Sequence, residues 1–114
     1  MSDPKTFEFQ GELFELDADG HLLDPSRWSP ALARAMAAEE GVELSDEQWW
    51  LIRFVREHQT RYGTPPLMRV VVAALREARA DPDLTSRDVY RLFRDNPVRE
   101  ACRLGGYPKP DWCI

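Results

Sequence analysis

Residues 44–63, LSDEQWWLIRFVREHQTRYG, are the stretch of this chain that says most about its fold. Ser45 and Gln48 have the spacing of a capping box, which begins a helix, and Gly63 is a typical residue for the end of one. Apolar residues recur at helical spacing over more than one face of this segment: they are Trp49, Trp50, Leu51, Ile52, Phe54 and Val55. We therefore expect a central, buried helix that ends at Gly63.

Two further helices are predicted next to this central one. Ser29 followed by Pro30 gives an N-cap and a first-turn proline, which predicts a helix over about 30–40. On the other side, Thr64 and Pro65 predict the start of a third helix that runs to the break at Asp81. Its expected inward stripe consists of Leu67, Val70, Val71, Ala74 and Leu75.

The last part of the chain predicts two shorter helices. Thr85, with Asp88 three positions later, caps a short fourth helix that holds Val89, Tyr90, Leu92 and Phe93. Asn96 and Pro97 start a fifth helix, which is expected to stop at Gly105.

The first segment has the alternation of strands. FEFQGELFELDADG, residues 7–20, contains two short strands with turns at Gln10-Gly11 and Asp19-Gly20. The apolar faces of this hairpin are assigned to Phe7, Phe9, Leu13 and Phe14. The predicted fold class is mainly α, a compact orthogonal bundle of about five helices with a small N-terminal β-hairpin and a flexible C-terminal arm. We divide the chain into a helical domain with its hairpin, 1–104, and a mobile arm, 105–114.

The composition of the chain argues against several classes of function. The chain has 114 residues, 15 Lys and Arg against 20 Asp and Glu, and a formal net charge of -5, which makes direct nucleic-acid binding unfavourable. No apolar run approaches the length of a membrane span, and no secretory signal is evident, so we expect a cytoplasmic protein. Two His and two Cys without a CxxC spacing give no support for a metal site, and no cofactor is predicted.

Both cysteines lie in ACRLGGYPKPDWCI, residues 101–114. Pro108 and Pro110 prevent this segment from continuing a helix, and Gly105 and Gly106 are interpreted as a hinge. The segment is therefore predicted to be an arm that delivers the thiol of Cys113 to a partner or folds it back toward the domain.

The chemistry expected of these thiols is sulfur exchange. A thiolate is the nucleophile, and nearby cations favour its formation; the candidates are Arg69, Arg103 and Lys109. If Cys113 attacks a sulfur donor it becomes a persulfide, which Cys102 can then attack. The structural alternative, in which Cys102 is a small core residue and Cys113 is exposed by chance, stays open.

The segment NPVREACRLGGYPKPDWCI resembles the C-terminal signature of the DsrC/TusE/DsvC family of sulfur-relay proteins, in which a G-x-P-K-P motif precedes a penultimate Cys. The similarity extends over nearly the whole chain. It includes DADGHLLDPSRW, LSDEQWWLIRFVRE, TPPLMRVVVAAL and VYRLF.

The resemblance implies that Cys113 carries sulfur and that Cys102 matches the second cysteine of DsrC-type members, which TusE-type members typically lack. DsrC-type members interact with dissimilatory sulfite reductase, whereas TusE-type members pass sulfur toward 2-thiouridine in tRNA. The presence of both cysteines favours the DsrC branch, in which the protein serves dissimilatory sulfite reductase or a related sulfur-oxidation system. The partners implied for the arm are sulfite reductase or sulfurtransferase proteins. Arg69 matches a helix-start arginine that steadies a thiolate or an oxyanion. The protein is then a carrier more than an autonomous enzyme.

Other features are assigned less specific roles. Trp49 and Trp50 are interpreted as core residues, and His21 and His58 as surface residues, since neither histidine belongs to a recognisable constellation. A non-catalytic regulatory or DNA-binding helical domain is the alternative from a different function class.

Overall fold

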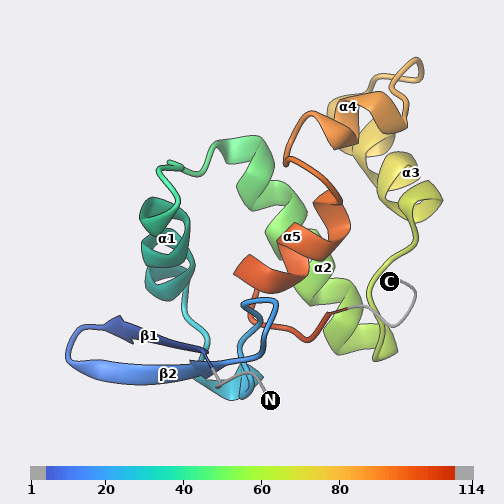
Figure 1. Cartoon of the computed structure of the whole chain (residues 1–114). Helices are drawn as coiled ribbons and strands as arrows, with labels where there is room; N and C mark the ends of the chain where they lie inside the picture. The colour runs from blue at the N-terminus through green and yellow to red at the C-terminus, as the bar shows by residue number, and fades with distance from the viewer. Residues whose placement is uncertain (1–4, 110–114) are drawn as a thin grey trace.

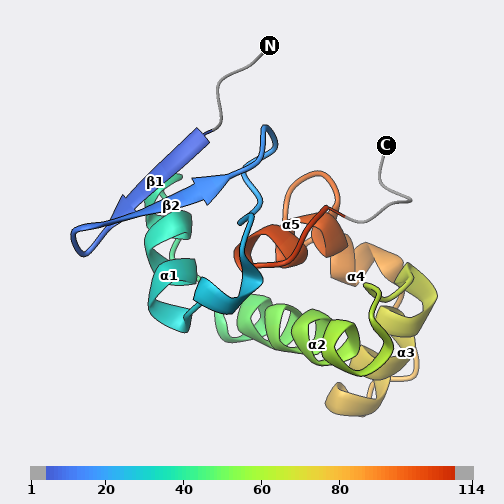
Figure 2. The same ribbon diagram turned by 90° about the horizontal axis from the view of Figure 1, so that it is seen from below.

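The structure, a computed structural model, describes residues 5–109. Within this range it contains an antiparallel hairpin and five α-helices, as the sequence predicts (Figure 1). The elements are β1 (Lys5–Phe9), β2 (Glu12–Leu16), a 3-10 helix η1 (Pro25–Arg27), α1 (Pro30–Glu39), α2 (Asp46–Tyr62), α3 (Met68–Arg79), α4 (Ser86–Tyr90) and α5 (Pro97–Leu104). The hairpin and α1 lie at one end of the molecule, α3 and α4 at the other, and α2 runs between them with α5 against it (Figure 2).

The hairpin turns at Gln10 and Gly11, which have φ angles of 52° and 80°. Two consecutive positive φ values define the turn that best matches strand twist, and they explain the preference for glycine there. Phe7 pairs with Phe14, whose side chain is buried. Leu13, which the sequence pattern assigns with these residues to the apolar faces of the hairpin, does not lie on the covered face: its side chain is 61% exposed, because successive residues of a strand point to opposite faces.

The predicted helix starts of α1, α2, α4 and α5 are confirmed by their caps. The Ser29 hydroxyl accepts a hydrogen bond from the Leu32 backbone N–H at 3.0 Å, and Ser45 with Gln48 forms the capping box of α2. Thr85 caps α4, which ends at Tyr90, so Leu92 and Phe93 follow that helix instead of belonging to it.

Helix α3 starts later than predicted. Thr64 and Pro65 both precede a proline, which disfavours helical backbone at each of them, and the helix begins at Met68. The predicted inward stripe is also shifted. Leu67 and Val70 are 46% and 37% exposed, while the buried residues of α3 are Val71, Val72 and Leu75. Because α3 packs against α4, position 72 faces the interior and position 70 does not.

The core lies where α2 meets its neighbours, and it confirms the central place of this helix. Leu51, Ile52 and Val55 of α2 have no exposed surface. The other fully or almost fully buried side chains of this core include Leu32, Val71, Leu75, Leu84, Val89, Val98, Ala101, Cys102 and Leu104. Burial of this apolar surface holds α5, and thus Cys102, firmly on α2.

Candidate functional site

Helix α5 carries one of the two predicted sulfur residues. Asn96 caps it by accepting a hydrogen bond from the Arg99 backbone N–H at 3.1 Å, and Pro97 occupies its first turn. Cys102 lies on the inner side of α5 and has no exposed surface. In this conformation its thiol is out of reach of solvent, which agrees with the structural interpretation and requires a movement of the chain for any exchange at this sulfur.

The two glycines after α5 form a helix-terminating turn. The Tyr107 N–H donates to the Cys102 carbonyl at 2.9 Å and the Gly106 N–H to the Arg103 carbonyl at 3.3 Å, the paired bonds of a Schellman motif. Gly106 adopts the left-handed conformation, with φ of 81°. Both glycines are buried, so in the described chain they fix its direction after the helix and do not form an open hinge.

Four side chains from other elements hold the chain that follows α5, and we call this group the tail anchor: His21, Trp28, Arg56 and Thr60. The Trp28 indole N–H donates to the Leu104 carbonyl at 2.7 Å, and the Arg56 guanidinium donates to the Gly105 carbonyl. The Tyr107 hydroxyl lies 3.0 Å from the Thr60 hydroxyl. The last residue of α5, Leu104, and two of the residues that follow it, Gly105 and Tyr107, are therefore held by side chains of other elements.

Arg56 occupies the centre of the tail anchor. Its guanidinium lies 3.7 Å from the ring centroid of Trp28 and 5.1 Å from that of Tyr107. Partial burial lowers the pKa of Arg56 from its ordinary value, because desolvation disfavours the charged form. Because an arginine guanidinium ordinarily loses its proton only far above neutral pH, the group stays cationic and keeps both ring contacts.

The assignment of His21 to the surface is wrong. The side chain is 1% exposed, and its Nδ1 donates to the Tyr107 carbonyl at 2.9 Å. The Asp19-Gly20 turn explains the burial: the Asp17 carboxylate accepts hydrogen bonds from the backbone N–H groups of Asp19 and His21, both at 2.9 Å. The turn carries His21 inward, beneath the chain that follows α5.

The three predicted cations lie in separate surroundings. Arg103 is 12% exposed and forms ion pairs of 2.8 Å with both Glu40 and Glu100, so two carboxylates already balance its charge. Lys109 lies 3.6 Å from the Asp19 carboxylate. Arg69 is exposed on α3 and forms no ion pair with any residue of the described range. None of these contacts brings a cation to Cys102.

Part of the predicted arm is described and part is not. Residues 105–109 are packed on the domain through the turn, the tail anchor and the Lys109 ion pair, which differs from a free arm beginning at Gly105. Pro110 and Cys113 lie outside the described residues, so the arm itself and the sulfur role of Cys113 stay predictions. The described chain is held to the domain as far as Lys109.

Residues 5–109 hold neither a metal-ligand cluster nor a helix that could span a membrane. Between residues 5 and 109, no three His, Cys, Asp or Glu side chains gather in a group that suits a metal ion. Over the same residues, no helix has the length and apolar character needed to cross a membrane.

The tail anchor contains residues that the sequence did not single out. Arg56 and Thr60 are four residues apart and so share a face of α2, which is the one local signal that links them. In the sequence, Trp28 stands out only as part of the segment DADGHLLDPSRW, which carries the family resemblance. Their pairing with residues 104–107 joins distant parts of the chain, and helical or strand periodicity carries no information about such pairs.

Replacing Trp28 with phenylalanine tests the anchor. The ring is kept in part, but the Leu104 carbonyl loses its donor, so we expect the free energy of unfolding to fall by roughly 1–2 kcal/mol. Urea denaturation followed by circular dichroism measures this. The matched control is Trp50→Phe, because Trp50 is also half-buried but stacks on Phe54 at 5.2 Å without an indole hydrogen bond in the described chain. An equal loss in the two variants would contradict a specific role of the Trp28 N–H.

Comparison with known proteins gives one consistent family. The family model described as DsrC like protein matches residues 8–114. The protein named Sulfurtransferase TusE of Salmonella paratyphi A is 42% identical over 106 residues, which cover 93% of this chain and 97% of that protein.

Solved structures agree in fold. The NMR structure of Allochromatium vinosum DsrC has a TM-score of 0.83 at 34% identity and covers 98% of this chain and 100% of that one. The crystal structure of the oxidized gamma-subunit of dissimilatory sulfite reductase, DsrC, from Archaeoglobus fulgidus has a TM-score of 0.84 at 33% identity and covers 96% of this chain and 100% of that one. The resemblance noted in the sequence is therefore confirmed: the chain belongs to the family of DsrC-like proteins.

Proposed function

We propose that this protein is a sulfur carrier of the TusE type, which accepts a sulfane sulfur on Cys113 and hands it to the next protein of a relay toward 2-thiouridine in tRNA. The observation that carries the proposal is the 42% identity, over nearly the whole of both chains, to the protein named Sulfurtransferase TusE. The DsrC structures, at 34% and 33% identity, are more distant in sequence. Because the identity to TusE is higher, we now favour the tRNA relay over the sulfite reductase function that the two cysteines favoured in the sequence analysis. A relay toward tRNA also agrees with the predicted cytoplasmic location.

The transfer step is thiol exchange and needs no redox partner. The Cys113 thiolate attacks the outer sulfur of a donor persulfide, R–S–SH. A new S–S bond forms on Cys113, the S–S bond of the donor breaks, and the donor leaves as the thiolate R–S⁻. The product is a persulfide on Cys113, and the sulfur moves without net oxidation or reduction.

The tail anchor supports this use of Cys113. Leu104, Gly105 and Tyr107 are fixed through their backbone carbonyls, and Tyr107 also through its hydroxyl, so the described end of the chain has a defined position on the surface. A fixed starting point limits the volume that the terminal thiol searches, which favours its encounter with a docked partner.

The presence of Cys102 favours a second candidate function, the DsrC-type exchange of sulfur with dissimilatory sulfite reductase. Under the resemblance, a second cysteine at this position is typical of DsrC-type members, which serve dissimilatory sulfite reductase. In that function Cys102 attacks the inner sulfur of the Cys113 persulfide, a disulfide forms and hydrosulfide leaves. Because Cys102 is fully buried on α5, this step requires the turn after α5 to open first.

Deleting the gene distinguishes the two candidates. If the relay function holds, 2-thiouridine in bulk tRNA, measured by liquid chromatography and mass spectrometry of nucleosides, falls by at least about tenfold, and a plasmid copy restores it whereas a Cys113→Ser copy does not. Unchanged 2-thiouridine together with lost sulfite reductase turnover would contradict the relay and support the second candidate.

A further inference from the structure

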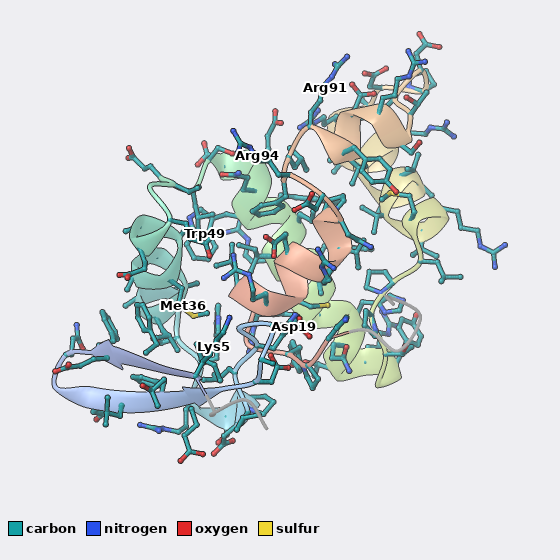
Figure 3. The ribbon with its side chains drawn as sticks, in the orientation of Figure 1. Lys5, Asp19, Met36, Trp49, Arg91 and Arg94 are labelled. Carbon is teal, nitrogen blue, oxygen red and sulfur yellow. The ribbon has the colours of Figure 1, made fainter. Side chains whose placement is uncertain are left out.

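A cleft of about 750 Å³ lies beside the tail anchor, between α1 and α2. Trp49 stands in the space between these two helices (Figure 3). The indoles of Trp28 and Trp49 are both half-buried and line the cleft together with Arg34, Arg53 and Arg56. The cleft thus combines two large aromatic rings with three guanidinium groups.

The charge of this cleft differs in sign from that of the chain. Three arginines face two acidic lining residues, Asp46 and Glu57, which leaves a local formal charge of +1, from 3 − 2, in a chain of net charge -5. None of the three arginines forms an ion pair with a carboxylate of residues 5–109. Two of them contact rings instead: Arg34 lies 5.2 Å from the Trp49 centroid, and Arg56 lies against Trp28.

The three arginines of the cleft differ in exposure, and therefore in whether they are available to a partner. Arg34 and Arg53 are exposed at the rim, whereas Arg56 is half-buried and already donates to the Gly105 carbonyl. Tryptophan and arginine are the residues that most often dominate binding energy at protein interfaces, and a guanidinium beside a carboxylate forms a paired, charge-assisted contact. The rim arginines are therefore available to an incoming acidic group.

We propose that this cleft receives an acidic segment of a partner protein that exchanges sulfur with Cys113. Carboxylates of the segment pair with Arg34 and Arg53, and an apolar or aromatic side chain enters between Trp28 and Trp49. The inference rests on the proposed function, because it names the surface on which a relay partner docks. Charge complementarity and the position of the cleft support this docking.

The cleft lies next to the chain segment that follows α5. Trp28 and Arg56 line the cleft and also hold the Leu104 and Gly105 carbonyls. A partner seated there lies next to the chain segment that leads to Cys113. Docking and tail anchoring therefore share the Trp28 side chain, and Arg56 lines the cleft while it holds the Gly105 carbonyl. We expect binding in the cleft to change the environment of the chain after α5.

A single-stranded nucleic acid is the competing class of partner, because bases stack on tryptophan and phosphates pair with arginine. The net charge of -5 opposes a long phosphate backbone, whereas a short acidic peptide meets only the local charge of the cleft. We therefore favour the acidic protein segment and make the nucleic acid an outcome of the test.

The test uses the full chain and three probes: a short peptide of alternating glutamate and phenylalanine, the same peptide with lysine in place of glutamate, and an oligouridylate. Chemical shifts of the indole N–H groups in ¹⁵N-labelled protein report binding. We expect the acidic peptide to shift the Trp28 and Trp49 signals, with an affinity that weakens as salt is added. Stronger binding of the lysine peptide or the oligouridylate would overturn the proposal, as would the absence of any shift with the acidic peptide.

The arginines are tested by the double variant Arg34→Gln, Arg53→Gln, with Arg61→Gln as the matched control. Arg61 is an exposed arginine of the same helix α2 that does not line the cleft. The double variant is expected to bind the acidic peptide about tenfold more weakly, and the control to bind it as the wild type does. Equal affinity in the double variant would overturn the docking site.

Sulfur loading distinguishes a failure of the proposed sulfur-carrier function from a failure of the proposed docking site. Inorganic polysulfide needs no docking surface, so the double variant is expected to load sulfur on Cys113 as the wild type does. Wild-type protein that does not load sulfur would remove the proposed function, whereas normal loading without peptide binding would remove only the docking site.

Discussion

Replacing Cys113 with serine is expected to abolish sulfur loading. After incubation with inorganic polysulfide, the wild-type protein should gain about 32 Da, the mass of one sulfur atom, and the variant should gain none. The reason is chemical: a serine hydroxyl is not ionised at neutral pH and does not displace a thiolate from sulfur. Intact-mass spectrometry without reductant measures the gain directly, and treatment with dithiothreitol should reverse it.

Cys102→Ser is the matched control for this experiment. Cys102 is fully buried on α5, so its removal should leave the gain of about 32 Da unchanged while the disulfide between the two cysteines no longer forms. Loading that persists in Cys113→Ser and disappears in Cys102→Ser would reverse the assignment of the two thiols. Loading in neither single variant would mean that the cysteines act as one unit.

Replacing Gly106 with alanine is expected to destabilise the protein by about 2–5 kcal/mol. Gly106 has φ of 81°, and a Cβ built on it would lie 2.6 Å from Cδ1 and 2.7 Å from Cβ of Trp28. The substitution therefore combines left-handed strain with a clash against a ring that is held in place by its hydrogen bond to Leu104. The free energy of unfolding in urea measures the loss.

Gly63→Ala separates strain from clash. Gly63 also has a positive φ, 73°, but nothing lies within 4 Å of the position that its Cβ would occupy. This control should lose only about 1–2 kcal/mol from backbone strain. If both variants lose the same free energy, the close approach of Gly106 to Trp28 does not contribute to stability, and the tail anchor is weaker than its contacts indicate.

The helices were largely predictable because their signals are local. The Ser45 hydroxyl accepts from the Gln48 N–H at the start of α2, and the Asn96 side chain accepts from the Arg99 N–H at the start of α5. Each cap joins residues three positions apart, so the sequence carries the information directly. The prediction was wrong at the start of α3, where consecutive prolines delay the helix to Met68. It was also wrong for Val70, whose exposure depends on which neighbour covers that face of α3.

For the candidate site the sequence predicts a sulfur chemistry, which stays a prediction, but not the surroundings of its residues. The sequence singled out Cys102 and Cys113 by their residue type and by the glycines and prolines between them. It did not predict that Arg103 pairs with Glu40 and Glu100, or that residues 105–109 are docked on the domain. These contacts depend on distances between separate elements, which no local pattern encodes.

By itself the sequence determined the helical class of this protein, its helix caps and the two thiols near its end, because each depends on residues that are neighbours along the chain. Only the tertiary structure decided that His21 is buried beneath Tyr107 and that Trp28 and Arg56 hold the chain after α5. Packing brings these groups together from parts of the chain that are far apart in sequence, and desolvation makes their hydrogen bonds necessary. A local pattern records which residues can form a helix, whereas the fold decides which carbonyl each donor meets.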